Sequence, residues 1–77
     1  MRHLTLTKTE RHLLREVDSI PDKVVGWSLL KMTAGRSLSP VGFTRVMDRM
    51  LRRNLLARND GTVTLTFAGM QALKEAV

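Results

Sequence analysis

One segment, residues 45–66, constrains the fold more than any other part of the chain, and it reads RVMDRMLRRNLLARNDGTVTLT. Up to residue 53 its apolar side chains recur with the helical period of about 3.6 residues, and from residue 55 the period is about 2, as in a strand. Asn54 separates the two parts, and asparagine tolerates the left-handed conformation that ends many helices. An arginine-rich helix therefore joins a hairpin without a spacer, and the two are expected to form one rigid unit.

The helix before this junction is predicted to cover residues 39–53. Ser39 is a suitable N-cap, and Pro40 would take the first helical position, where its missing N–H is no loss. The apolar spacing predicts one buried stripe, which comprises Phe43, Val46, Met47 and Met50. At about 100° per residue, the opposite side carries Val41, Arg45, Asp48, Arg49 and Arg52. The outward face of this helix is thus rich in arginine.

The hairpin is predicted over residues 55–66. Asp60-Gly61 favours a type I′ turn, in which both central residues have positive φ. With these two residues at the turn, the opposite pairs are Leu56 with Leu65 and Arg58 with Val63. A three-residue loop with Gly61 in a bulge would shift this pairing by one residue.

A last helix is expected from Phe67 to about Val77, with Thr66 as its cap. Its expected apolar side comprises Phe67, Met70, Leu73 and Val77. Two uses of this side remain open: it could contact a second copy in a symmetric homodimer, or it could pack on the first helix of the same chain.

The first helix is predicted to begin after Thr7 and to end at about Asp18. Thr7 and Glu10 fit a capping box, in which each side chain accepts a hydrogen bond from the other residue's backbone N–H. The buried side of this helix is expected to comprise Leu13, Leu14 and Val17. Pro21 then ends the helical pattern, because the residue before a proline is pushed out of helical geometry.

A second helix is predicted over residues 23–34, with Asp22 as its N-cap. Gly26 would lie inside it, at a cost of about 1 kcal/mol relative to alanine. Gly35 suits the left-handed position after a helix end. The expected apolar positions are Val25, Leu29, Leu30 and Met32, with Trp27 as an anchor of the core.

Positive charge is concentrated in one part of the chain. The net charge is +6 at pH 7. Residues 36–58 hold six arginines against one aspartate: Arg36, Arg45, Arg49, Arg52, Arg53 and Arg58 against Asp48. An excess made of arginine alone, in one short segment, favours a phosphate-bearing partner over general solubility.

Several classes of protein are disfavoured. The 77 residues, as given, suit a single domain over 1–77, and the absence of cysteine excludes disulfides and thiolate metal sites. No apolar run approaches the roughly 18 residues that span a bilayer, and the first residues do not resemble a signal peptide, so we expect a cytoplasmic protein without membrane contact. The sequence holds no glycine-rich phosphate loop and no paired-carboxylate motif. We therefore expect no enzyme, no cofactor and no bound metal.

The order of the predicted elements points to a function. A helix can enter the major groove of DNA, while a hairpin beside it lies along the backbone or the minor groove. Three helices, a short two-stranded hairpin and a C-terminal helix therefore predict a mostly α, α+β fold of the winged helix-turn-helix type.

At this point the sequence resembles a known family. The run LSPVGFTRVMDRMLRRNLLARNDGTVTLTFAGMQAL, residues 38–73, resembles the winged-helix core of the MarR-type bacterial transcriptional regulators. The similarity lies in the Leu-Ser start of the basic helix, in Thr-Arg-Val-Met-Asp-Arg-Met, in Asn-Leu-Leu-Ala-Arg, and in the Leu-Thr-x-x-Gly pattern of residues 65–69. The resemblance implies a DNA-binding transcriptional regulator.

Roles at single positions follow from this resemblance. It places Ser39, Val41, Gly42, Thr44 and Arg45 near bases and adjacent phosphates, Arg49 near the backbone, and Arg58 at the base of the wing. Arg52 joins them from the basic face of the helix. The hairpin tip is shorter and less basic than in the family, and the long terminal helices that form the family's ligand pocket have no counterpart here. We therefore expect no small-molecule ligand.

Two functions are carried forward. The first is a small transcriptional regulator that places helix 39–53 in the major groove of double-stranded DNA, with hairpin 55–66 as a wing. The second is a winged-helix protein-interaction module, such as an assembly subunit or a phage or plasmid protein acting on a host factor. RNA binding is a third interpretation, disfavoured because single-stranded RNA recognition uses exposed aromatic side chains and the chain has only three aromatic residues.

Overall fold

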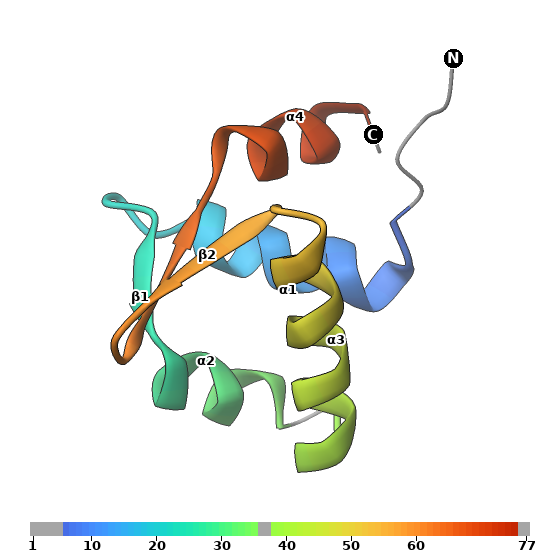
Figure 1. The fold of residues 1–77 in the computed structure, drawn as a ribbon, viewed down its shortest axis with the longest axis vertical. Coiled ribbons are helices and arrows are strands. Elements are labelled where there is room, and N and C mark those ends of the chain that lie inside the picture. Colours follow the sequence, from blue (N-terminus) through green and yellow to red (C-terminus); the bar gives the residue numbers. More distant parts are fainter. Residues whose placement is uncertain (1–5, 36–37, 76–77) are drawn as a thin grey trace.

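The computed structural model describes residues 6–35 and 38–75. Its elements are α1 (Lys8–Asp18), β1 (Val24–Gly26), α2 (Trp27–Ala34), α3 (Pro40–Arg52), β2 (Leu56–Asn59), β3 (Thr62–Leu65) and α4 (Phe67–Glu75). The three strands form an antiparallel sheet in the order β1-β3-β2. In Figure 1, α4 and α2 lie at opposite ends of the long axis, α1 crosses between them, and α3 stands to one side of the sheet.

The core draws on every one of these elements. Its deepest side chains come from α1, α3 and the hairpin, and they include Leu14, Val17, Met47, Met50, Leu55 and Val63. None of the helices in the described part of the chain has the length and apolarity needed to cross a membrane.

The start of α1 has the predicted capping box. The Thr7 hydroxyl accepts a hydrogen bond from the Glu10 N–H at 3.1 Å, and the Glu10 carboxylate accepts one from the Thr7 N–H at 2.9 Å. The buried side of α1 comprises Leu13, Leu14 and Val17, as predicted, together with Glu10. The structure thus adds a buried carboxylate to a face that the sequence predicts to be apolar.

The predicted start of the second helix is wrong. Residues 24–26 form β1, and Lys23 before them has a φ of 55°. α2 begins only at Trp27, with Gly26 in the N-cap position. β1 pairs with β3, whose outer backbone groups would otherwise lack partners. This pairing outweighs the local preference for a helix, which is a weak determinant.

α2 ends at Ala34, as predicted, but Gly35 has a φ of −61° rather than a left-handed conformation. A helix of eight residues directs only Leu30 and Ala34 into the core. Leu29 and Met32 were expected inside, yet they are 57% and 70% exposed. Because Leu30 and Ala34 face the core, the helical period of about 100° per residue places Leu29 and Met32 on the outer face of α2.

α3 follows its prediction closely. The Ser39 hydroxyl accepts a hydrogen bond from the Gly42 N–H at 3.0 Å, and Pro40 is the first helical residue. Of the predicted stripe, Phe43, Met47 and Met50 are buried, while Val46 packs at the edge of the core. Asn54 has a φ of 61°, the left-handed conformation expected after the helix.

The hairpin has the predicted register, with Leu56 opposite Leu65 and Arg58 opposite Val63. Its turn differs from type I′, because Asp60 has a φ of 57° whereas Gly61 does not have a positive φ. The hairpin is two-stranded, as predicted, and β1 adds a third strand to its sheet that was not predicted.

Thr66 and Gly69 fix α4 to the rest of the fold. The Thr66 hydroxyl accepts a hydrogen bond from the Gly69 N–H and donates one to the Asn54 carbonyl. A Cβ on Gly69 would collide with the Leu55 carbonyl oxygen, so this position needs glycine. The Thr-x-x-Gly part of the family resemblance therefore has a structural cause.

The buried side of α4 differs from the predicted stripe. Gly69, Ala72 and Leu73 are buried, and α4 packs against α1. Phe67 is 71% exposed and Met70 is only partly buried. The prediction for Val77 lies outside the described residues.

Candidate nucleic-acid interface

The outer face of α3 is a continuous exposed stripe. A period of 3.6 residues aligns its members, and they are Val41, Thr44, Arg45, Asp48 and Arg52. All five lie opposite the buried side chains Phe43, Met47 and Met50. The helix thus presents an open polar surface while its other side is held in the core.

The first turn of α3 combines an apolar side chain with two hydroxyls in different states. Val41 is 64% exposed. The Ser39 hydroxyl oxygen accepts the cap bond, so its proton remains free to donate outward. The Thr44 hydroxyl donates to the Pro40 carbonyl at 3.0 Å, so only its oxygen and methyl group are free to meet a partner. Gly42 is half-buried, and an added Cβ would lie 3.2 Å from the Ser39 hydroxyl oxygen.

Arg45 stands apart from the other arginines of α3. Within residues 6–35 and 38–75 it makes no hydrogen bond or ion pair, and its side chain is exposed. All five N–H donors of its guanidinium are therefore open to an external acceptor.

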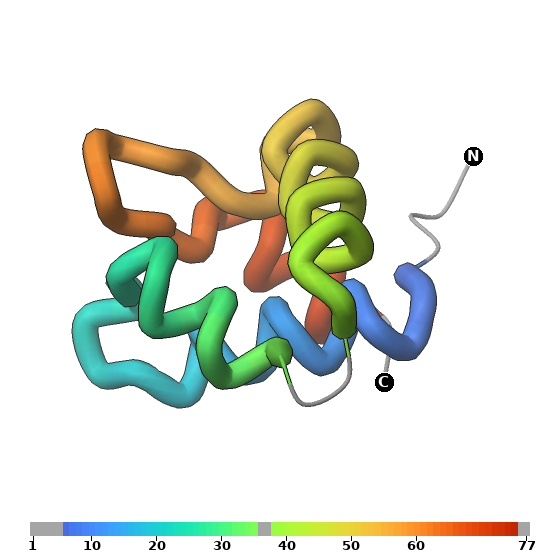
Figure 2. Tube along the Cα trace, turned by 90° about the horizontal axis from the view of Figure 1, so that it is seen from below, coloured from blue at the N-terminus to red at the C-terminus, as the bar shows by residue number. Residues whose placement is uncertain are grey.

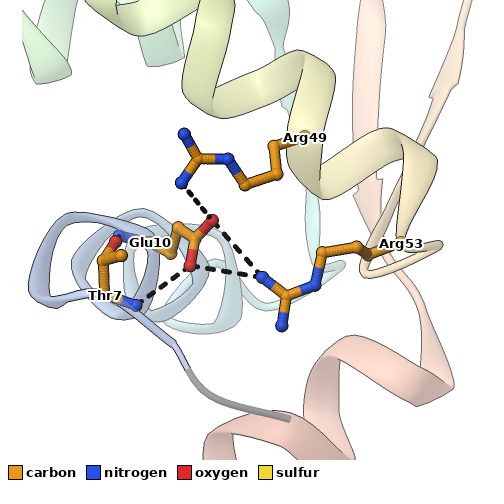
Figure 3. A network of polar contacts seen from close by, with 4 residues as sticks. All are labelled: Thr7, Glu10, Arg49 and Arg53. Atoms are coloured by element: carbon orange, nitrogen blue, oxygen red, sulfur yellow. Dashed lines mark hydrogen bonds and ion pairs between the residues drawn. The ribbon is translucent and has the colours of Figure 1, made fainter.

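Arg49 and Arg53, in contrast, share one buried carboxylate. The Arg49 Nη1 lies 3.3 Å from Glu10 Oε2, and the Arg53 Nη1 lies 3.4 Å from Glu10 Oε1. Figure 3 shows both guanidinium groups converging from α3 and its end onto Glu10, which also accepts the Thr7 N–H. Glu10 has no exposed surface, whereas the Arg49 side chain remains 53% exposed. Arg49 is thus tied to α1 while part of it still faces solvent.

Arg52 has a weaker internal partner. Its Nη2 lies 3.1 Å from Asp48 Oδ2 one helical turn earlier, and both side chains are largely exposed. Water screens an exposed pair of this kind, so it holds the arginine only loosely. Arg52 therefore remains available to an outside anion.

The base of the wing carries Arg58, which is held by an aromatic ring rather than by a carboxylate. Its Cζ atom lies 3.9 Å from the centroid of the Trp27 ring. The Trp27 ring in turn meets Phe43 of α3 edge-on, with centroids 5.4 Å apart and planes at 78°. The backbone N–H of Trp27 also donates a hydrogen bond to the Gly61 carbonyl at 2.7 Å. Figure 2 shows the start of α2 next to the hairpin.

The structure therefore brings Val41, Thr44, Arg45 and Arg52 onto one face of α3, with Ser39 at the N-cap and Arg58 on the adjoining hairpin. Arg36 lies outside the described residues. Neither the contact of Glu10 with the arginines nor that of Trp27 with Arg58 was predicted from the sequence. Both contacts join residues more than 30 positions apart in the sequence, and no local pattern reports them.

Surface hollows lie beside α1, away from α3. One of about 270 Å³ is lined by Lys8, Thr9, His12, Leu13, Ala34 and Leu38. Another, of about 300 Å³, lies between α1 and α4. Neither includes a residue of α3, and the absence of a small-molecule ligand stays a prediction.

The backbone is similar to one known structure in particular, the crystal structure of a MarR family transcriptional regulator from Streptomyces coelicolor. The TM-score is 0.77, with 22% sequence identity over 92% of this chain and 51% of that chain. This chain thus spans about half the length of that regulator. No protein-family model matches the sequence, and no curated protein matches it. The likeness establishes a MarR-like winged-helix fold.

Proposed function

We propose that this protein is a small double-stranded-DNA-binding transcriptional regulator, with α3 in the major groove and the β2–β3 hairpin as its wing. The observation that carries the proposal is the exposed stripe of α3, where Arg45 has all its donors open. The fold supports it, because a helix held from behind by a core can lie in a groove about 12 Å wide. The similar structure is itself that of a transcriptional regulator.

Each residue of the interface has a role that suits its chemistry. Arg45 is assigned to a base, because a free guanidinium can donate two parallel hydrogen bonds to guanine. Val41 suits the methyl group of thymine, and the Ser39 hydroxyl suits a phosphate or a base acceptor. Arg49, Arg52 and Arg58 are assigned to phosphates. Gly42 and Thr44 complete the surface, Gly42 by the small volume at the helix start and Thr44 by its methyl group.

We further propose that the protein binds as a homodimer through α4. The described domain measures 35 × 25 × 20 Å, so one copy covers about one helical turn of DNA. Two copies on adjacent half-sites would double the phosphate contacts. Phe67 supports this surface, because it is 71% exposed at the start of α4 and offers a large apolar side chain to a partner. α4 packs against α1 and its Leu73 is buried, while Phe67 stays exposed and open to a partner.

The proposal is tested by titrating fluorescent duplex DNA with the protein at two salt concentrations, with the mass in solution measured alongside. We expect binding that weakens steeply as salt rises, because each phosphate contact releases condensed counterions. Arg45→Ala and Arg52→Ala should each weaken binding. Arg15→Ala removes the same charge from an exposed position on α1 and serves as the matched control.

The outcomes separate the parts of the proposal. Binding unchanged by Arg45→Ala and Arg52→Ala, or weakened equally by Arg15→Ala, contradicts the role of α3. A protein that stays monomeric at tens of micromolar, on palindromic DNA as well, contradicts the dimer and leaves binding at a single site intact.

One observation favours the second function, a protein-interaction module. Leu29 and Met32 lie one turn apart on the outer face of α2 and are both largely exposed. In a helix-turn-helix the helix before the recognition helix crosses the DNA backbone, where apolar side chains offer nothing to phosphate. Replacement of both residues by serine should leave DNA binding unchanged if they face a protein partner. A loss of DNA binding would place this face at the DNA.

A further inference from the structure

Arg58 occupies an unusual place for a cation. Residues paired across a sheet point to the same side, and Arg58 is opposite Val63, which is in turn opposite Val25. Both valines are buried in the core. Arg58 thus belongs to a row of inward-facing side chains but sits at its outer end, where the core stops and the Trp27 ring begins.

The Trp27 ring is fixed from two directions. Its face carries the Arg58 guanidinium, and it meets the buried Phe43 ring edge-on. The backbone bond from Trp27 to Gly61 holds the same residue to the hairpin turn, independently of its side chain. The ring therefore bridges α3 and the hairpin.

Stacking on a ring affects a guanidinium differently from pairing with a carboxylate. A carboxylate uses the N–H donors, as Glu10 does with Arg49. An aromatic face instead attracts the flat side of the cation and leaves the donors at its edge free. Arg58 is consequently restrained in position while it keeps both its charge and its donors for an acceptor.

We propose that Trp27 is a positioning residue for Arg58: its ring holds the guanidinium in the orientation that meets a DNA phosphate beside the recognition helix. The inference rests on the proposed function and deepens it. An unrestrained arginine loses rotamer freedom when it binds, and a stacked one has lost much of it already. The expected gain is about two- to fivefold in affinity, the range of an exposed cation–π contact.

The stack itself is tested first in the free protein. Trp27 is the sole tryptophan, so its fluorescence reports directly on what lies against the ring. Arg58→Ala should change the intensity or wavelength of the emission, whereas Arg15→Ala should leave both unchanged. Emission that is identical in Arg58→Ala and the parent overturns the stack.

The positioning role is tested by a cycle of DNA-binding measurements on Trp27→Leu, Arg58→Ala and the double variant. Trp27→Leu should weaken binding about two- to fivefold, and it should have little further effect once Arg58 is alanine. Trp27→Phe keeps an aromatic face and should restore most of the affinity. Arg58→Lys keeps the charge but loses the flat stacking surface, and it should weaken binding to a similar extent as Trp27→Leu.

Thermal melting of each variant separates positioning from folding, and the Arg58→Lys measurement remains decisive if Trp27→Leu does not fold. An undiminished effect of Trp27→Leu in the Arg58→Ala background overturns the inference, and so does full binding by Arg58→Lys. Either result leaves the DNA-binding function standing, provided that the parent protein binds. Absence of binding by the parent overturns both.

Discussion

The two ends of α3 carry the same kind of side chain in different surroundings. Near its start, Arg45 has no internal partner among the described residues. Near its end, Arg49 and Arg53 meet the buried Glu10, and Arg52 meets Asp48. Clustered arginines in a sequence therefore do not all form one binding surface: some hold the helix in place while others remain open.

The helical period explains the difference. At about 100° per residue, Arg45 and Arg52 stay on the outer stripe, while Arg49 and Arg53 rotate toward α1. There they neutralise a carboxylate that no water reaches, and a buried charge without such partners would be strongly unfavourable. The end of α3 is thus anchored by charge, whereas its start is anchored by Phe43 and its cap.

The largest effect is expected from removing the apolar anchor. Phe43→Ala should lower the free energy of unfolding by about 3–5 kcal/mol, because the ring is fully buried and also meets Trp27. The loss is comparable with the total stability of a small domain, so the variant should be largely unfolded. Circular dichroism during thermal melting provides the measurement. Val41→Ala on the exposed side is the control, and equal melting of the two variants would contradict the assigned core.

Removal of the charged anchor should have the next largest effect. Glu10→Ala should lower the free energy of unfolding by about 2–3 kcal/mol, since the cap bond to Thr7 and the contacts with both arginines are lost together. Glu10→Gln, which can still accept the Thr7 N–H, should be intermediate. Urea titration gives the values, with Glu16→Ala, at a half-buried carboxylate on the same helix, as control. If Glu16→Ala lowers the free energy of unfolding by the same amount, the contacts of the buried Glu10 do not stabilise the fold in particular.

Under the proposed function, the contrast between the two ends should also appear in DNA binding. Arg45→Ala should reduce the preference for the specific site about tenfold, the order of one bidentate base contact. Arg52→Ala should weaken all sequences alike and reduce the slope of log affinity against log salt by about 0.9, the value for one phosphate. Competition between specific and random duplexes at several salt concentrations measures both. If Arg52→Ala instead reduced the preference for the specific site and Arg45→Ala weakened all sequences alike, Arg52 would contact the base and Arg45 the phosphate.

The smallest effect is expected at the exposed ion pair between Asp48 and Arg52. Asp48→Asn should strengthen binding to any duplex by about two- to threefold, because it removes a negative charge from the outer stripe and frees Arg52. Its effect on stability should stay within about 0.5 kcal/mol, as for most exposed ion pairs. The titration of duplex DNA measures the affinity, and the urea titration measures the stability. Weaker binding would show that Asp48 orients Arg52 rather than competing for it.

The features predicted correctly share one property, which is that they depend on neighbours in the sequence. The capping box at Thr7 and Glu10 joins residues three positions apart, and the cap at Ser39 does the same. The hairpin register follows from a turn at Asp60 and Gly61 with alternating side chains around it. Arg45 was likewise placed on the outer face by helical period alone.

The features missed depend on distant partners. β1 exists because β3 offers it an unpaired edge, and without that edge residues 24–26 fit the start of a helix. The exposure of Leu29 and Met32 depends on which side of α2 packs on the core, and that side is the one with Leu30 and Ala34. Phe67 was likewise assigned to the buried side of the last helix. The packing of α4 on α1 leaves it exposed.

The sequence by itself determined which segments become helix and hairpin in the second half of the chain, and which side of residues 40–52 faces water, because periodicity and capping act over a few residues. Only the tertiary structure decided which arginines meet Glu10 and which one meets Trp27. Glu10 lies 39 residues before Arg49, and Trp27 lies 31 residues before Arg58, so each contact is made by the fold. Among the described residues, an arginine keeps all its donors open only where folding leaves it without an internal partner, as at Arg45, or with one that does not use its donors, as at Arg58.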